Sequence, residues 1–242
     1  MREQEGGIII LHLLALAVTV TAGFLTTRRA DPIPFLKFIP IYLGGMAVFS
    51  LNVSVDLGLV AISGGWVRSL AVVCFCIVAI YVFRLDRHAV GLVLPLGRSA
   101  WLVSVGGALA CLVFTSLFVL LDVFLFRPGV SHVALGVDWL YVFSMPGLLE
   151  ELAFRGIALA VLSSAVPSGA MTMPALAVTA LFGLAHVTLG DEMVPNLPRV
   201  AAALCLGGIL LFIRLRSGSL LGGVLAHNAV NLTAFLLYRL LG

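Results

Sequence analysis

Residues 101–125 read WLVSVGGALACLVFTSLFVLLDVFL, and Asp122 is the one charged residue in this run. A continuous apolar run of about 18 to 25 residues is long enough to cross the hydrocarbon core of a bilayer as a helix. Transmembrane β-strands would instead show shorter segments in which apolar and polar residues alternate. The run therefore predicts a membrane-spanning helix.

The rest of the chain has the same apolar character. Of its 242 residues, 62% are hydrophobic and 10% are charged, with a mean hydropathy of +1.18. This composition would give a water-soluble domain an insoluble surface. We therefore expect an all-α, polytopic transmembrane bundle of about eight spans, which forms a single integral membrane domain over residues 1–242. The expected spans are 8–25, 38–61, 66–83, 101–125, 139–163, 172–190, 199–213 and 219–240.

Polar stretches separate these runs, among them 31–34, which contains two prolines, and the charged stretch 84–98. The run 8–25 is expected to be an anchored helix because Arg28 and Arg29 follow it directly. Cleavage of a signal peptide near Thr21-Ala22 is the alternative.

The basic residues are dispersed among the connecting segments, and the net charge is only +3, so we exclude a nucleic-acid-binding surface. With eight spans, the odd-numbered loops hold eight basic residues and the other side holds five. The positive-inside rule then places both termini outside the cytoplasm. Thirteen of the fourteen basic residues are Arg, which is typical of a GC-rich bacterial genome, so we expect a multi-pass protein of a bacterial inner membrane.

All four cysteines fall inside predicted spans, where small apolar side chains are common, so neither a disulfide nor a metal cluster is expected. Cys74 and Cys76 are two residues apart and are predicted to point to roughly opposite faces of one helix. The other two are Cys111 and Cys205.

Ionisable side chains inside the predicted spans are the feature that points to function. Each costs roughly 2.5 to 3.5 kcal/mol on insertion, so a retained one is expected to pair or to act. Glu151 and Arg155 are four residues apart, in the order that favours an ion pair along a helix. Glu150 lies about 100° around the helix and has no basic residue three or four positions away, so it needs a partner from another span.

Two further spans supply such partners. His186 lies in the sixth run, and His227 and Asn231 lie four residues apart on one face of the eighth. Each span would otherwise bury a polar group alone, so we expect these groups to meet in the bundle interior. Asp122 has no assigned role and is expected to cap or pair near the end of its span.

A carboxylate in apolar surroundings has a raised proton affinity and can act with an imidazole to activate water. A second imidazole and an amide N–H can stabilise the oxyanion that forms when this water attacks a carbonyl. This set of groups suits peptide hydrolysis without a Ser or Cys nucleophile. The same carboxylate and two imidazoles are also a zinc ligand set, although the chain has no His-Glu-x-x-His element.

The polar clusters resemble, in the correct order, the three motifs of the CPBP family of intramembrane proteases. The matching segments are Glu150-Glu151-x-x-x-Arg155, Phe182-x-x-x-His186 and His227-x-x-x-Asn231. The family includes the prenylated-protein (CaaX) endopeptidases of the Rce type and the bacterial Abi proteins. The resemblance covers about residues 139–240, whereas residues 1–130 carry no motif.

The resemblance implies a helical bundle with a water-accessible cavity that opens into the membrane. It also implies a glutamic, metal-free mechanism without a cofactor, with zinc as the alternative. In this mechanism Glu150 and His186 activate the water, and His227 with Asn231 form the oxyanion site. Glu151 and Arg155 would brace the first motif, and Phe182 would line the site.

The expected partners are the lipid bilayer and a membrane-anchored or lipid-modified protein or peptide. Relatives cleave after a prenylated cysteine, process pheromones or bacteriocins, or, as myxosortases, clip a carboxy-terminal sorting signal. The compact chain is compatible with a myxosortase-like member. Two functions of other classes stay open: a non-catalytic membrane protein, such as a bacteriocin-immunity or chaperone-like factor, and a proton-coupled transporter that uses Glu150 as a relay.

Overall fold

The computed structural model describes residues 32–49, 55–56, 61–62, 64–95, 97–126, 139–166, 171–187 and 197–241. This part of the chain is helical except for a two-residue antiparallel pairing of β1 (Val55–Asp56) with β2 (Ala61–Ile62). The helices of the first half are α2 (Pro32–Phe49), α3 (Gly64–Val82), α4 (Arg87–Val90), α5 (Arg98–Leu121) and the π-helix η1 (Asp122–Phe126). Those of the second half are α6 (Trp139–Glu150), the π-helix η2 (Glu151–Ala158), α7 (Leu159–Ser164), α8 (Thr172–Ala185), α9 (Leu197–Ser217) and α10 (Leu221–Leu241).

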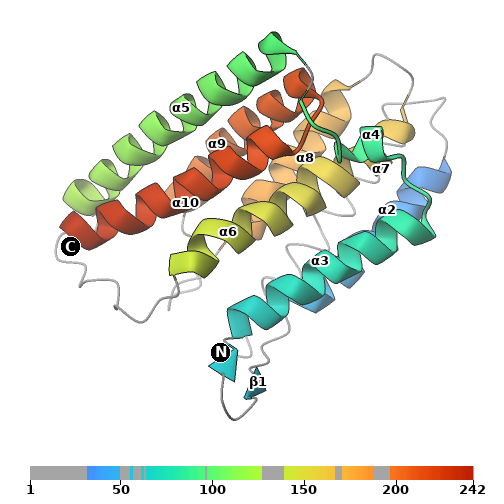
Figure 1. Cartoon of the computed structure of the whole chain (residues 1–242), viewed down its shortest axis with the longest axis horizontal. Helices are drawn as coiled ribbons and strands as arrows, with labels where there is room; N and C mark the ends of the chain where they lie inside the picture. The colour runs from blue at the N-terminus through green and yellow to red at the C-terminus, as the bar shows by residue number, and fades with distance from the viewer. Residues whose placement is uncertain are drawn as a thin grey trace.

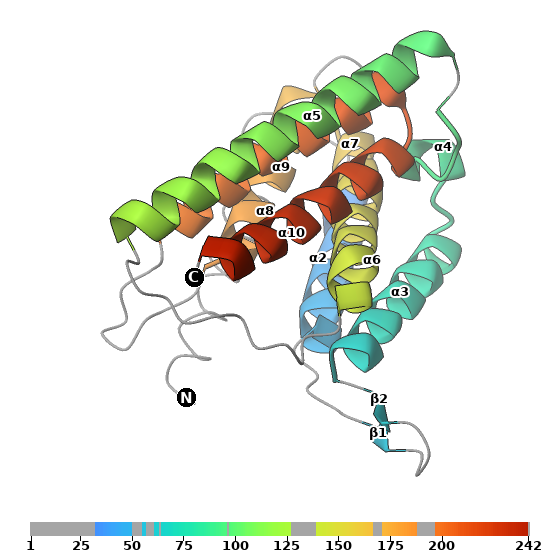
Figure 2. The same cartoon turned by 60° about the vertical axis from the view of Figure 1, so that its left-hand side comes forward.

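Two groups of helices pack around a central rod. The rod is the continuous run of α6, η2 and α7. On one side α5, α9 and α10 lie along one another, and α10 also packs against α6 (Figures 1 and 2). On the other side α2 and α3 form a pair that contacts α6, η2 and α7. The rod is therefore in contact with both groups, and its middle is buried by both.

Three of the described helices are long and apolar enough to cross a membrane: Arg98–Leu125, Leu197–Ser217 and Leu221–Leu241. Two shorter apolar helices accompany them, Trp66–Val82 and Thr172–Ala185. The all-helical membrane architecture is thus confirmed, whereas the number of eight spans stays a prediction. The first predicted span, 8–25, lies outside the described residues.

The second predicted span is wrong in its bounds. Helix α2 begins at Pro32 and ends at Phe49. It therefore starts before residue 38 and ends before residue 61, the predicted bounds of this span. Stretch 31–34 is therefore not simply a break, because Pro32 and Pro34 lie in the first turn of a helix. Proline is well tolerated there since the first-turn N–H groups have no partner within the helix. Helix α9 also extends beyond the predicted 199–213, to Ser217.

The cysteine prediction agrees with the fold. Cys74 is exposed and Cys76 is buried, as expected for residues on opposite faces of α3. All four cysteines are free.

Glycines allow α5 to lie close to α9. A Cβ atom on Gly107 would lie 2.4 Å from Cγ1 of Ile213, a residue in the buried cluster between α5, α9 and α10. The neighbouring Gly106 faces open space, with nothing within 4 Å of its Cβ position. Consecutive glycines of α5 therefore differ sharply in their surroundings.

This difference predicts opposite effects of the same substitution. Gly107→Ala should lower the midpoint of thermal unfolding in detergent, because Ile213 must move out of a packed core. Gly106→Ala should leave it unchanged or raise it, because alanine is favoured over glycine in helices by about 1 kcal/mol. Equal shifts of the unfolding midpoint in the two variants would contradict this packing.

Candidate active site

A buried ion pair joins the first turn of η2 to two neighbouring helices. Arg155 Nη1 donates to Glu151 Oε1 at 3.0 Å, and both side chains have no exposed surface. Arg155 Nη2 donates to the backbone oxygen of Gly207 in α9 at 3.1 Å, and the guanidinium carbon lies 3.9 Å from the centre of the Phe182 ring. The predicted pairing of Glu151 with Arg155 is confirmed, and Arg155 also connects η2 to α8 and α9.

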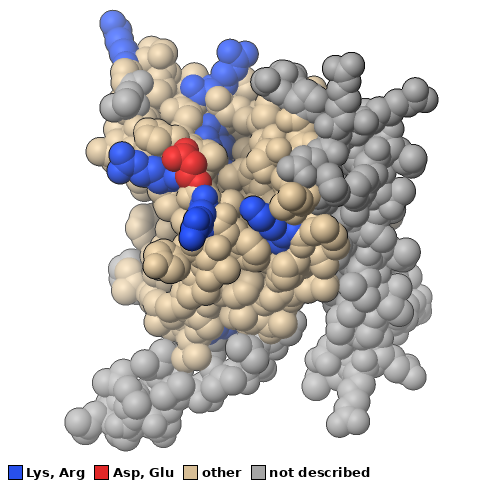
Figure 3. All heavy atoms as spheres, turned by 90° about the vertical axis from the view of Figure 1, so that its right-hand side faces the viewer, with Lys and Arg blue, Asp and Glu red and all other residues tan. Residues whose placement is uncertain are grey.

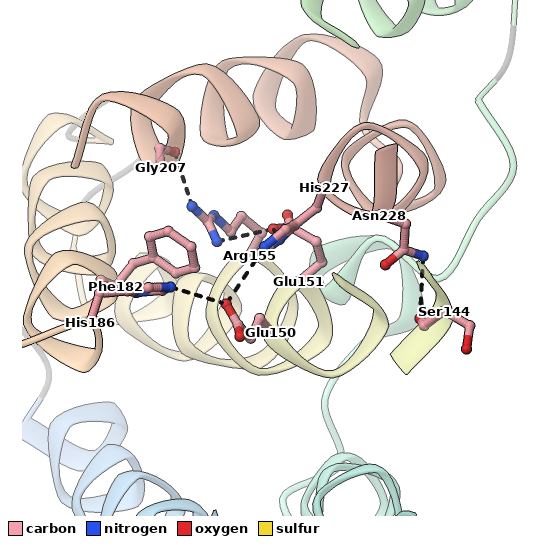
Figure 4. A network of polar contacts seen from close by, with 9 residues as sticks. All are labelled: Ser144, Glu150, Glu151, Arg155, Phe182, His186, Gly207, His227 and Asn228. Atoms are coloured by element: carbon pink, nitrogen blue, oxygen red, sulfur yellow. Dashed lines mark hydrogen bonds and ion pairs between the residues drawn. The ribbon is translucent and has the colours of Figure 1, made fainter. Parts of the chain in front are cut away.

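Glu150 ends α6 and faces two histidines that come from other helices (Figure 4). Its Oε2 atom lies 3.9 Å from Nε2 of His186, just after α8, and 3.7 Å from Nε2 of His227 in α10. The Glu150 side chain is 18% exposed, so water reaches the group. Its Oε2 atom is buried and has no hydrogen bond to any described residue. The structure therefore brings Glu150, His186 and His227 together, with partners for Glu150 from two other helices.

The hydrogen bonds at the Nδ1 atoms fix the tautomers of both imidazoles. His186 Nδ1 lies 2.8 Å from the backbone oxygen of Phe182, which can only accept, so this nitrogen carries a proton. His227 Nδ1 lies 2.9 Å from Glu151 Oε1, the carboxylate already paired with Arg155. Both Nε2 atoms then face the Glu150 carboxylate with a lone pair unless one more proton is present. At 3.7 to 3.9 Å, one water molecule can connect the Glu150 carboxylate to either Nε2 atom.

Phe182 packs at the centre of this group. Its ring centre lies 4.6 Å from that of His186 and 5.8 Å from that of His227. The same ring also contacts Arg155 and Phe154. An aromatic ring in this place excludes water from the ion pair and limits the orientations of both imidazoles. The predicted site position of Phe182 agrees with these contacts.

A cavity of about 410 Å³ lies between α5, α9 and α10 and reaches the candidate site. Its lining includes Phe182, His186, His227 and Asn231, so Asn231 shares this space with both histidines. Glu150 is not among the lining residues and contacts the two imidazoles from α6. The structure therefore places His186, His227 and Asn231 around one cavity, and Glu150 contacts the two histidines that line it.

Asp122 lines the same cavity at some distance from the histidines. It is 5% exposed and accepts a hydrogen bond from the hydroxyl of Tyr238 at 2.7 Å. The prediction that Asp122 pairs near the end of its span is confirmed. Arg199 lines this part of the cavity as well.

The sequence interpretation missed the part that Asn228 plays. This residue is 8% exposed, and its Nδ2 atom donates to the backbone oxygen of Ser144 in α6 at 3.2 Å. Gly147 makes the approach possible, because a Cβ atom there would lie 2.1 Å from the Asn228 side-chain oxygen. Asn228 thus joins α10 to α6 one residue after His227. The sequence did contain a signal for this contact, because Asn228 is a second amide side chain, beside Asn231, in the same apolar run.

In the described helices and loops, no three His, Cys, Asp or Glu side chains are grouped so that they could hold an ion. We therefore derive no chemical step through zinc.

One comparison with known proteins gives a match. Residues 132–233 match the family model described as "Type II CAAX prenyl endopeptidase Rce1-like". This segment contains every residue of the site described above. No curated protein and no solved structure matches the chain.

The buried pair predicts a strong coupling between two substitutions. Arg155→Met and Glu151→Gln should each lower the free energy of unfolding by about 3 to 5 kcal/mol, because each leaves one buried group without its partner. The double variant should be less destabilised than the sum of the two, by about 1 to 3 kcal/mol.

Thermal and denaturant unfolding in detergent measure these values. Arg216→Met, which changes an exposed arginine of α9, serves as the control and should change the stability little. Additive effects of the two buried substitutions would show that Glu151 and Arg155 do not depend on each other.

Proposed function

Because residues 132–233 form an Rce1-like domain of the CPBP family, we propose that the chain is an intramembrane endopeptidase that hydrolyses a peptide bond in a membrane-anchored protein or peptide. The family match indicates an enzyme of the CAAX protease type. The observation that carries the proposal is the meeting of Glu150 with His186 and His227, which come from three separate helical segments. A carboxylate between two imidazoles in an apolar bundle suits proton transfer to and from water.

In the proposed reaction, Glu150 and His186 take a proton from a water molecule as its oxygen attacks the carbonyl carbon of the substrate. A water at roughly 2.8 Å from both Glu150 Oε2 and His186 Nε2 is compatible with their separation of 3.9 Å. The Glu150 carboxylate then carries this proton. On collapse of the tetrahedral intermediate the C–N bond breaks, and this proton passes to the leaving amine.

His227 and Asn231 are proposed to stabilise the oxyanion. Both line the cavity in which the substrate carbonyl would lie. The bond from His227 Nδ1 to Glu151 has a consequence here, because Nε2 can donate only when the ring is doubly protonated. The proposed oxyanion role of His227 therefore requires the imidazolium form. Glu151 orients the His227 ring, and Arg155 holds the Glu151 carboxylate in place.

The alternatives from other classes are weaker. A non-catalytic scaffold gives no reason for two imidazoles to converge on one carboxylate. A proton relay for transport would use the same groups, but in the described part of the chain the cavity extends from the site toward one end of the bundle, and Gly222 and Gly223 toward the other end are buried. We therefore keep hydrolysis as the conclusion.

Replacing Glu150 tests the conclusion directly. Purified chain in liposomes should release a defined product from a peptide with a prenylated cysteine fourth from its carboxyl end, or from a single-span peptide. Glu150→Gln keeps the shape of the side chain but loses the base, so kcat should fall about 10²- to 10⁴-fold. Asp86→Asn, at an exposed carboxylate that caps α4, is the matched control and should retain activity.

Equal cleavage by the wild type and Glu150→Gln would remove Glu150 from the mechanism. The same assay distinguishes the metal-free mechanism from zinc catalysis. Full activity after removal of metals by a chelator contradicts zinc catalysis, whereas loss of activity together with loss of a stoichiometric metal contradicts the metal-free mechanism.

The oxyanion role predicts a change in kcat with little change in KM. Asn231→Ala should lower kcat about 10²- to 10³-fold, the usual effect of losing one oxyanion donor. Thr233→Ala lies on the same helix outside the cavity lining and should leave kcat near the wild-type value. An unchanged kcat in Asn231→Ala, with the fold intact, would contradict the oxyanion role.

A further inference from the structure

The two ends of the bundle differ in charge. Five arginines of the described chain lie at the end that carries α4, and four of these side chains, Arg84, Arg87, Arg98 and Arg216, are exposed. Figure 3 shows blue side chains across this face of the molecule, with a single red group among them. The opposite end carries three described arginines, Arg68, Arg199 and Arg239. We call the first of these the arginine-rich end.

The arginine-rich end is assembled from segments far apart in the sequence. Arg214, the fifth arginine, is 6% exposed and donates to the backbone oxygen of Ala89 in α4 at 2.7 Å. The backbone N–H of Leu220 donates to the oxygen of Gly91 at 3.0 Å, and the Ser219 hydroxyl donates to the oxygen of Val93 at 2.5 Å. The loop before α5 and the loop between α9 and α10 therefore lie on the same side of the membrane, whatever the number of spans.

These contacts also close the arginine-rich end above the candidate site. Ser219, Leu220, Gly222 and Gly223 are all buried. A Cβ atom on Gly223 would lie only 2.9 Å from Glu151 Oε2, so α10 packs directly on the ion pair at this level.

The cavity leads to the other end. Along α9, Arg199 lies about 25 Å from Arg216 at the rise of an α-helix. Along α10, Tyr238 lies about 25 Å from Leu221, and along α5, Asp122 lies about 36 Å from Arg98. Arg199, Asp122 and Tyr238 all line the cavity, and Arg199 is exposed. Three helices thus show that the cavity extends toward the end opposite the arginine-rich end.

We infer that the arginine-rich end lies at the cytoplasmic surface and that the cavity opens to the extracytoplasmic side. Short loops rich in Lys and Arg remain in the cytoplasm, where they also face anionic lipid headgroups. This inference deepens the proposed function and rests on it for the identity of the site. The substrate is then a membrane-anchored polypeptide that presents its scissile bond from the extracytoplasmic side.

The cavity also limits the length and the composition of the substrate segment that can bind. Tyr238 lies about 16 Å from His227 along α10, which corresponds to roughly five residues of extended chain. Between these ends the lining is mainly apolar, with Val119, Ala202, Ala203 and Ala234 among its residues. An extended, mostly apolar segment next to the scissile bond fits this space.

Cysteine labelling tests the orientation without any substrate. In a variant whose four cysteines are replaced by alanine, Ser99→Cys marks the arginine-rich end and Leu240→Cys, 78% exposed in the wild type, marks the other. A membrane-impermeant maleimide should label Leu240→Cys in intact bacterial spheroplasts and Ser99→Cys only after permeabilisation. Labelling of Ser99→Cys before permeabilisation, or failure to label Leu240→Cys at that stage, overturns the inference.

A second arm separates this inference from the proposed function. The same cleavable peptide is displayed on a lipid-anchored reporter at either the extracytoplasmic or the cytoplasmic surface, with Glu150→Gln as the inactive control. Cleavage of the extracytoplasmic reporter alone is expected, and cleavage of the cytoplasmic one alone overturns the inference while leaving the protease intact. If neither reporter is cleaved in membranes or in detergent, the proposed function fails, and the labelling still decides the orientation.

Discussion

The buried contact between Glu151 and Arg155 is the interaction on which the rest of the site depends. Neither charge has access to water, so each is stabilised only by its partner and by fixed polar groups. Arg155 uses its second nitrogen for the backbone of α9, and Glu151 uses the same oxygen for His227 of α10. One ion pair therefore holds three helical segments in register. Glu150, the preceding residue along the chain, faces His186 and His227 instead of Arg155.

The change from α-helix to π-helix falls between two adjacent glutamates that have different surroundings. Residue Glu150 ends α6, and Glu151 begins the wider turn of η2. Short π-helical segments are rare and often occur at functional sites, where they change the direction of individual side chains. Here one carboxylate is fully buried against an arginine, whereas the other keeps 18% of its side-chain surface and contacts imidazoles. The difference suits one group for structure and the other for proton transfer.

The sequence predicted the parts of this site that follow from local geometry. The spacing of four residues was sufficient to pair Glu151 with Arg155. Glu150 has no basic residue three or four positions away, which was sufficient to predict a partner from another span. The contact between His227 and Glu151 joins residues 76 positions apart, and no local rule predicts it. The π-helix has no sequence signal, and the start of α2 was misjudged because prolines that begin a helix resemble prolines that end one.

Gly91 has a consequence for the order in which the bundle is completed. Its φ of +84° is readily available only to glycine, and a Cβ atom there would lie 2.5 Å from Nε of Arg214. The peptide that Arg214 binds is thus shaped in the first half of the chain, but it gains its partner only after α9 has been synthesised, more than 100 residues later. Docking of Arg214 on Ala89 therefore cannot occur before α9 has been synthesised, and it joins the two halves of the protein.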